Sequence, residues 1–217
     1  MTSILHNKVE NPIAQVIFAH GAGANMAHGF MDNFTRLLNE QHINVLRFNF
    51  PFMDKRAETG KRYPPDRMPK LLVCYQEVIN NYLATLSQET TKLPLFIGGK
   101  SMGSRVASTL AGKQENFEHI AGVFCIGYPF HPAKKIDKLR LEPLQSIKKP
   151  VLILQGDRDP LGSQAEIADY EISHFCQCKF FVDGDHDLKP RVKSGYKHEQ
   201  HLSEAAQSIR AFIDEHG

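Results

Sequence analysis

Short apolar runs alternate along the chain with longer stretches whose apolar residues recur every three or four positions. Six runs rich in β-branched and other apolar residues are typical of short strands, and they cover residues 15–19, 45–50, 95–98, 120–126, 151–155 and 179–182. The spacing predicts helices over residues 30–39, 69–86, 103–111, 162–170 and 201–215. In the last of these, Leu202, Ala205 and Ile209 lie on one stripe that faces a core.

The alternation of strands and helices predicts an α/β fold, with a mostly parallel sheet covered by helices on both faces. The 217 residues contain no internal repeat, low-complexity tract or linker-like segment. We therefore expect one domain over residues 1–217. Ligands bind such sheets at the carboxyl ends of the strands, so candidate chemistry is expected directly after each apolar run.

The end of the run 95–98 carries the motif Gly99-Lys100-Ser101-Met102-Gly103. A G-x-S-x-G pattern between a strand and a helix is the context of a nucleophile elbow, a sharp turn that exposes the serine hydroxyl. Glycine on both sides leaves room for such a turn. The N–H of Met102 would lie at the start of the next helix, where it can stabilise an oxyanion. Ser101 is thus the candidate nucleophile.

A loop of small residues, His20-Gly21-Ala22-Gly23-Ala24, follows the run 15–19. Such residues let the backbone approach a reacting carbonyl group, and the N–H of Ala22 is the expected second donor of an oxyanion hole. A loop of this composition also serves as a plain connection between a strand and a helix. Both interpretations remain open from the sequence.

Candidates for the acid and the base follow the last two apolar runs. Asp157 and Asp159 come after the fifth run, and either carboxylate could orient an imidazole. We favour Asp159, because Asp157 is nearer the strand and Pro160 restrains its neighbour; Asp157 is the alternative. His186 follows the sixth run and is the expected base. The order Ser101, Asp159, His186 is that of the α/β-hydrolase fold.

Composition narrows the possible partners. The 26 basic and 24 acidic residues leave a net charge of +2, which is too balanced to indicate a nucleic-acid surface or binding to an anionic membrane. No apolar run reaches the roughly 18 residues of a membrane helix, and residues 1–10 lack a signal-peptide core. We therefore expect a soluble, cytoplasmic protein. The four cysteines lie in apolar or strand-like stretches and are expected to be reduced thiols.

The segments described above resemble the α/β-hydrolase superfamily, and the match spans nearly the whole chain. More narrowly, residues 98–103 (Gly-Gly-Lys-Ser-Met-Gly) and 47–52 (Arg-Phe-Asn-Phe-Pro-Phe) are similar to a small dienelactone-hydrolase-like group that includes eukaryotic KANL-type and testis-expressed relatives. The resemblance implies a hydrolase fold with Ser101, His186 and Asp159 as its triad. It implies no established substrate.

Two features depart from the pattern of that superfamily. No long helical insertion follows the run 120–126, where a lid usually lies, so we expect a minimal lid or none. Lys100 is an unusual neighbour of an elbow serine, because the residue before the nucleophile tends to project into the packed structure. A buried ammonium needs an acidic partner. A structural ion pair is therefore favoured over a catalytic lysine.

The expected function is hydrolysis of a carboxylic ester or related acyl bond through an acyl-Ser101 intermediate. His186 would pass the proton, and neither a metal nor an organic cofactor is required. Thioester hydrolysis and acyl transfer use the same machinery. The alternative from another class is a catalytically silent hydrolase-like module that binds a protein partner.

Basic residues flank the expected cleft on two sides. The segment 52–70 carries six of them, and three more follow His186; they are Lys55, Arg56, Lys61, Arg62, Arg67, Lys70, Lys189, Arg191 and Lys193. Their charge could attract a small substrate that carries a carboxylate or a phosphate. Charge runs of this kind also commonly just face water, so the anionic substrate is one of two open interpretations.

Overall fold

The computed structural model describes residues 2–86, 92–113 and 118–217. Within these residues one sheet takes seven strands in the order β1-β3-β2-β4-β5-β6-β7. The strands are β1 (Ile4–Asn7), β2 (Ala14–Ala19), β3 (Ile43–Phe48), β4 (Leu95–Lys100), β5 (Ile120–Ile126), β6 (Val151–Gly156) and β7 (Cys176–Phe181). Only β1 is antiparallel to its neighbour, and the other pairs are parallel. The predicted mostly parallel sheet is confirmed.

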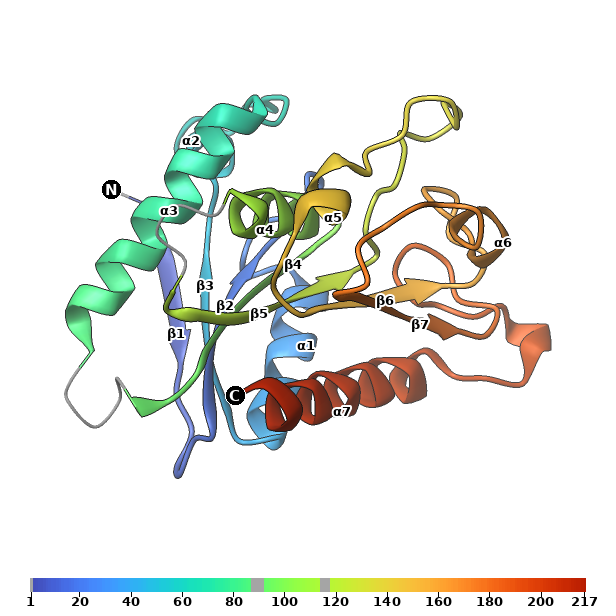
Figure 1. The fold of residues 1–217 in the computed structure, drawn as a ribbon. Coiled ribbons are helices and arrows are strands. Elements are labelled where there is room, and N and C mark those ends of the chain that lie inside the picture. The colour runs from blue at the N-terminus through green and yellow to red at the C-terminus, as the bar shows by residue number, and fades with distance from the viewer. Residues whose placement is uncertain (1, 87–91, 114–117) are drawn as a thin grey trace.

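Helices cover both faces of this sheet (Figure 1). The helices are α1 (Gly29–Glu40), α2 (Pro51–Thr59), α3 (Met68–Thr85), α4 (Met102–Gly112), α5 (Glu142–Ser146), α6 (Gln164–Ile167) and α7 (His198–His216), and a short 3-10 helix covers Val192–Ser194. Helices α1 and α7 pack on one face, and α3, α4 and α5 lie on the other.

The parallel strands are buried on both sides, which explains why their sequences read as continuous apolar runs. In β2, Ile17 faces the core beneath α3 and α4, whereas Val16 and Phe18 face the core beneath α1 and α7. In β4, Ile97 faces the core beneath α3 and α4, and Phe96 faces the core beneath α1 and α7. Successive side chains of a strand point to opposite faces. Because both faces of these strands are covered by helices, consecutive residues are apolar and polar residues do not alternate with them.

The structure corrects several expectations about the connections. Strand β1 was not predicted, because it is a largely exposed edge strand without an apolar run. The segment 52–70 is not all loop, since Pro51 begins α2 and Gly60, at a φ of 66°, ends it. Helix α5 was also missed, and α6 is shorter than the predicted helix over residues 162–170. These are short elements with little periodicity.

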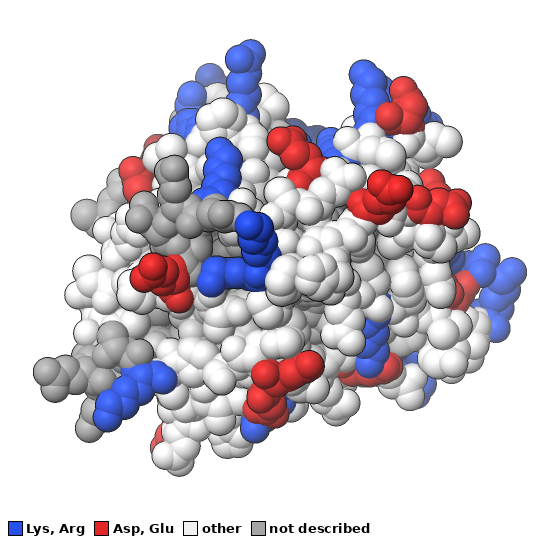
Figure 2. All heavy atoms as spheres, in the orientation of Figure 1, with Lys and Arg blue, Asp and Glu red and all other residues white. Residues whose placement is uncertain are grey.

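Two further features bear on the expected character of the protein. Residues 127–150, all of which are described, contain no helix besides the five-residue α5, so no helical lid lies between β5 and β6. Lysines and arginines are interspersed with acidic residues over the face shown in Figure 2. In the described part of the chain, no helix combines the length and apolar character needed to cross a membrane.

Candidate active site

The predicted elbow is present between β4 and α4. Ser101 has a φ of 53° and a ψ of −112°, a strained conformation for a residue other than glycine, and its N–H donates to the carbonyl oxygen of Ile126 at 2.9 Å. A Cβ on Gly99 would lie 2.2 Å from the carbonyl carbon of Gly103, and a Cβ on Gly103 would lie 2.5 Å from the carbonyl oxygen of Ala19. Glycine is therefore required on both sides of Ser101.

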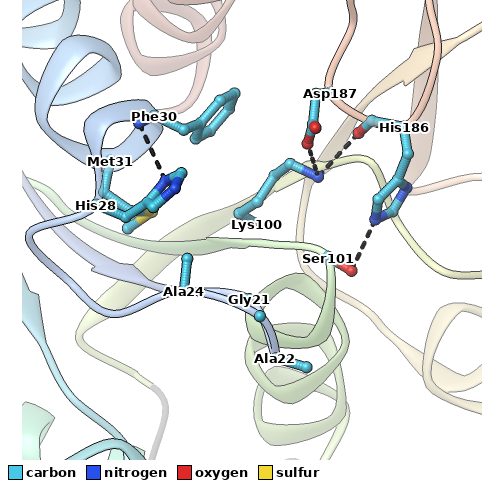
Figure 3. A pocket seen from close by; sticks show the side chains of 11 residues that line it. Gly21, Ala22, Ala24, His28, Phe30, Met31, Lys100, Ser101, His186 and Asp187 are labelled. Carbon is cyan, nitrogen blue, oxygen red and sulfur yellow. Dashed lines mark hydrogen bonds and ion pairs between the residues drawn. The ribbon is translucent and has the colours of Figure 1, made fainter. Parts of the chain in front are cut away.

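Three side chains that are far apart in the sequence form one hydrogen-bonded series. The Oγ of Ser101 lies 2.8 Å from the Nε2 of His186 (Figure 3), and the Nδ1 of His186 lies 2.8 Å from the Oδ2 of Asp159. A carboxylate accepts the hydrogen of Nδ1, which leaves Nε2 free to accept the hydroxyl hydrogen of Ser101. The geometry thus brings together the three residues predicted to act as nucleophile, base and acid.

Asp159 is fully buried and held by more than the imidazole. Its Oδ2 accepts from the side-chain amide of Gln155 at 2.9 Å, and its Oδ1 accepts from the N–H of Leu161 at 2.8 Å. The sequence analysis missed Gln155, although a glutamine at the end of an apolar strand was a signal for it. Asp157, the alternative acid, lines a different cavity with Arg158 and Arg191.

The loop that carries His186 packs directly against the end of β5. A Cβ on Gly127 would lie 2.6 Å from the carbonyl oxygen of His186 and 3.2 Å from its ring. Gly127 also has a φ of 59°, which disfavours any side chain there. This close approach helps to position the imidazole of His186 next to Ser101. No local sequence motif indicates the contact between Gly127 and His186.

The two predicted oxyanion donors, Ala22 and Met102, line the same cavity beside Ser101. Met102 is the first residue of α4, so its N–H belongs to the helix N-terminus. Ala22 borders both cavities that meet at Ser101. The preceding Gly21 lies against the elbow, since a Cβ on it would be 3.4 Å from the carbonyl oxygen of Lys100. Both backbone segments are therefore next to the hydroxyl of Ser101.

The side chain of His20 holds the loop 20–24 through hydrogen bonds to the backbone. Its side chain is fully buried; Nε2 accepts from the N–H of Phe50 at 3.0 Å, and Nδ1 lies 2.6 Å from the carbonyl oxygen of Gly21. These partners require a neutral ring with its hydrogen on Nδ1. Burial accordingly lowers the pKa of His20 to about 4. The sequence analysis assigned His20 no role of its own.

Acidification is expected to destabilise the fold through His20. Its pKa is about 4 in the folded protein and about 6.5 in an exposed chain, so the unfolded state takes up the proton first as the pH falls. The contribution of neutral His20 to the free energy of unfolding is therefore complete above about pH 6.5, and about 2 kcal/mol of this free energy is lost by about pH 5. Urea unfolding at these two pH values should show a smaller loss in His20→Gln than in the wild type. An equal loss in both proteins would refute this role.

Lys100 forms the ion pair that the sequence predicted for it. Its side chain is 9% exposed, and Nζ lies 3.0 Å from the Oδ1 of Asp187 and donates to the carbonyl oxygen of His186 at 2.8 Å (Figure 3). Burial lowers the pKa of Lys100, an effect that Asp187 opposes. Burial also raises the pKa of Asp187, but the ammonium of Lys100 outweighs this and lowers it overall. The lysine thus links the nucleophile strand to the histidine loop.

Lys100→Met should lower kcat/KM for ester hydrolysis about 10- to 100-fold, because His186 loses the donor that holds its backbone. The free energy of unfolding should change by no more than about 1 kcal/mol, because methionine fills a similar volume and the side chain of Asp187, which loses its partner, is 61% exposed and stays solvated. Kinetics and urea unfolding measure the two quantities. Lys179→Met, which removes the remote pair with Glu204, is the matched control. Equal kinetic effects of both variants would contradict a positioning role for Lys100.

Two cavities meet at Ser101. The first cavity, of about 370 Å³, is lined by the loop 21–24 with His28, Phe30, Met31 and Lys100. The second cavity, of about 320 Å³, is lined by Pro65, Asp66, Met68, Leu71, Arg105 and Arg140 together with Leu161. The segment 52–70 does border the site, but none of the nine basic residues singled out above lines either cavity. Both volumes are at the lower end of those of small-molecule sites.

Comparison with known families agrees with this architecture. A family model described as the alpha/beta hydrolase domain matches residues 12–214, which include every strand except β1. The chain therefore belongs to the alpha/beta hydrolase family. The predicted resemblance to the superfamily is confirmed at this level.

Solved structures resemble the whole chain. A dienelactone hydrolase from Anabaena variabilis has a TM-score of 0.73 at 16% identity, covering 99% of this chain and 92% of its own. Est1E from Butyrivibrio proteoclasticus, solved with ferulic acid, has a TM-score of 0.72 at 14% identity and coverages of 99% and 95%. A Xanthomonas campestris serine hydrolase described as lacking a lid has a TM-score of 0.63 at 16% identity and coverages of 99% and 87%. At these identities the similarity establishes the fold.

Proposed function

We propose that this protein is a serine hydrolase that cleaves a carboxylic ester through an acyl-Ser101 intermediate. The observation that carries the proposal is the series of two 2.8 Å contacts from Asp159 through His186 to Ser101. An imidazole hydrogen-bonded on one side to a carboxylate and on the other to a serine hydroxyl is the arrangement that makes the hydroxyl oxygen nucleophilic.

In the proposed reaction the Oγ of Ser101 attacks the ester carbonyl while Nε2 of His186 takes the hydroxyl proton. The N–H groups of Ala22 and Met102 would stabilise the negative charge on the carbonyl oxygen. His186 then gives its proton to the departing alcohol, and the acyl group stays on Ser101. A water molecule, deprotonated by His186, releases the acid and restores the serine.

The cavities indicate a small substrate. They flank Ser101 on two sides, so one can hold the acyl part and the other the leaving alcohol. Their mixed apolar and polar linings suit a small organic ester better than a long lipid or a polypeptide. The structural relatives support this size class, since one is a dienelactone hydrolase and another binds ferulic acid.

We also propose that the chain acts as a single domain in the cytoplasm. One sheet takes strands from Ile4 to Phe181, and the two described cores both pack against this sheet, one on each face, which supports a single domain. All four cysteines are free thiols, and Cys74 and Cys125 are buried. Reduced cysteines of this kind are typical of a reducing compartment.

A serine-directed fluorophosphonate probe tests the proposed function. The folded wild type should be labelled, and the label should be lost in both Ser101→Ala and His186→Ala but kept in Ser208→Ala, which removes a serine hydroxyl from the remote α7. Failure of the folded wild type to react would reject the hydrolase and leave a catalytically silent binding module. A panel of matched esters and thioesters, with and without an added alcohol acceptor, then separates esterase, thioesterase and acyltransferase.

A further inference from the structure

We propose that the second cavity binds a negatively charged group of the substrate through Arg105 and Arg140, so that the preferred substrate is a small ester with a carboxylate or phosphate a few bonds from the reacting carbonyl. This inference rests on the proposed serine hydrolase function and adds its substrate class. Both arginines line the second cavity, which opens directly on Ser101 and Met102.

Arg105 stands one helical turn beyond the nucleophile. Its N–H donates to the carbonyl oxygen of Ser101 at 3.2 Å, and residues four apart on a helix share a face. The Nε of Arg105 is buried and has no hydrogen-bond partner in the described part of the chain. A buried donor without an acceptor is unfavourable. The side chain that carries this donor lines the second cavity, where a bound molecule can supply an acceptor to its guanidinium group.

Arg140 reaches the same cavity from the segment between β5 and α5. Burial lowers the pKa of its guanidinium, and the like charge of Arg105 lowers it further. Within residues 2–86, 92–113 and 118–217, neither guanidinium forms an ion pair with a carboxylate. Two partly buried positive charges that repel each other without a counter-ion are costly, and an anion between them removes that cost.

One acidic residue, Asp66, also lines the second cavity, but its oxygens are already engaged. Its Oδ2 accepts from the N–H of Phe52 at 2.9 Å, and its Oδ1 pairs with Nζ of Lys70 at 2.8 Å. The charge of Asp66 is thus matched by Lys70, which leaves the arginine pair as the uncompensated charge of the cavity.

The chemistry of the lining favours an oxyanion over other groups. A guanidinium presents a planar fork of N–H donors that matches a carboxylate or a phosphate. Met68, Leu71 and Leu161 supply apolar wall in the same cavity, which suits a short hydrocarbon spacer. A half-ester of a dicarboxylic acid has this form: an ester carbonyl at one end, a short chain, and a carboxylate at the other.

The test compares 4-nitrophenyl hemiglutarate with its uncharged methyl ester. In the wild type, kcat/KM should be at least about tenfold higher for the anionic ester, as charged hydrogen bonds of this kind provide. The preference, taken as the ratio of the two values, should fall below about threefold in Arg105→Gln and in Arg140→Gln, and should be partly restored in Arg140→Lys. Arg62→Gln removes an exposed charge from the neighbouring loop and should keep the full preference.

The outcomes separate this inference from the proposed function. Ser101-dependent hydrolysis of both esters without a preference for the anionic one overturns the inference and leaves the serine hydrolase standing. A preference that survives in both Arg105→Gln and Arg140→Gln, or that is lost in Arg62→Gln, also overturns it. If neither ester is hydrolysed and the fluorophosphonate probe does not label the protein, both the anion site and the proposed serine hydrolase function are refuted.

Competitive inhibition identifies the kind of anion. Glutarate and inorganic phosphate are each titrated against hydrolysis of the uncharged ester by the wild type and by Arg140→Gln. Stronger inhibition by glutarate, reduced in Arg140→Gln, assigns the cavity to a carboxylate. Stronger inhibition by phosphate with the same dependence on Arg140 assigns it to a phosphate ester, and inhibition by neither overturns the anion site.

Discussion

Ser101→Ala is expected to lower kcat/KM for ester hydrolysis by at least about 10⁴-fold while the protein stays folded. Alanine lacks the only atom proposed to attack the substrate, and it meets the same backbone strain as serine at a φ of 53°. The hydroxyl bonds only to His186 among the described residues, so its removal leaves no other buried group unpaired. Hydrolysis of 4-nitrophenyl acetate and thermal unfolding measure the two effects.

The same experiment shows whether the residues act as a unit. His186→Ala should cost about as much as Ser101→Ala, and the double variant should lose little more, because a nucleophile without its base contributes no more than the rest of the site. Ser208→Ala is the control for removal of a remote hydroxyl. Activity of Ser101→Ala within about tenfold of the wild type would contradict the account.

Asp159→Asn is expected to lower kcat by about 10⁴-fold. Asp159 accepts from Leu161 at Oδ1 and from both Gln155 and His186 at Oδ2. An asparagine that keeps the bond to Leu161 places its NH₂ group against the amide of Gln155 and the Nδ1 of His186. The imidazole must then accept at Nδ1 and carry its hydrogen on Nε2, the tautomer that cannot take a proton from Ser101.

Asp157→Asn is the matched control, because it makes the same change two residues away. Asp157 lines a separate cavity with Arg158 and Arg191, so kcat should change by less than about threefold. Pre-steady-state and steady-state rates with one ester give both values. A larger loss in Asp157→Asn than in Asp159→Asn would reassign the acid and refute the geometry proposed for the site.

The nucleophile region was predictable because its determinants are local. Gly99 is required by its contact with Gly103 and Ser104, within a few residues of Ser101, whereas Gly103 is required by its approach to the end of β2 at Ala19. The G-x-S-x-G motif between a strand and a helix nevertheless indicates the turn from one short segment. Asp159 and His186 each follow a predicted parallel strand, and the carboxyl ends of such strands share one edge of the sheet, so the sequence predicts both residues at that edge. The roles of all these residues in catalysis remain predictions that the experiments above test.

What the sequence did not yield depends on packing between distant segments. The role of Gln155 depends on its hydrogen bond to Asp159, which only the fold brings about. A Cβ on Gly127 would lie 2.6 Å from the carbonyl oxygen of His186, and these two residues are 59 positions apart in the chain. Arg105 and Arg140 come from different elements and share a cavity only through the fold. Strand β1 and helix α2 were missed because neither carries a run of apolar residues.

The most direct test of the account is to trap the acyl-enzyme. The wild type is mixed with 4-nitrophenyl pivalate, whose hindered acyl group slows deacylation, quenched in acid and mapped by peptide mass spectrometry. The account predicts a single pivaloyl group on Ser101 that appears with the burst of nitrophenol and is absent from His186→Ala. A nitrophenol burst accompanied by acylation of another residue, with Ser101 unmodified, would contradict it.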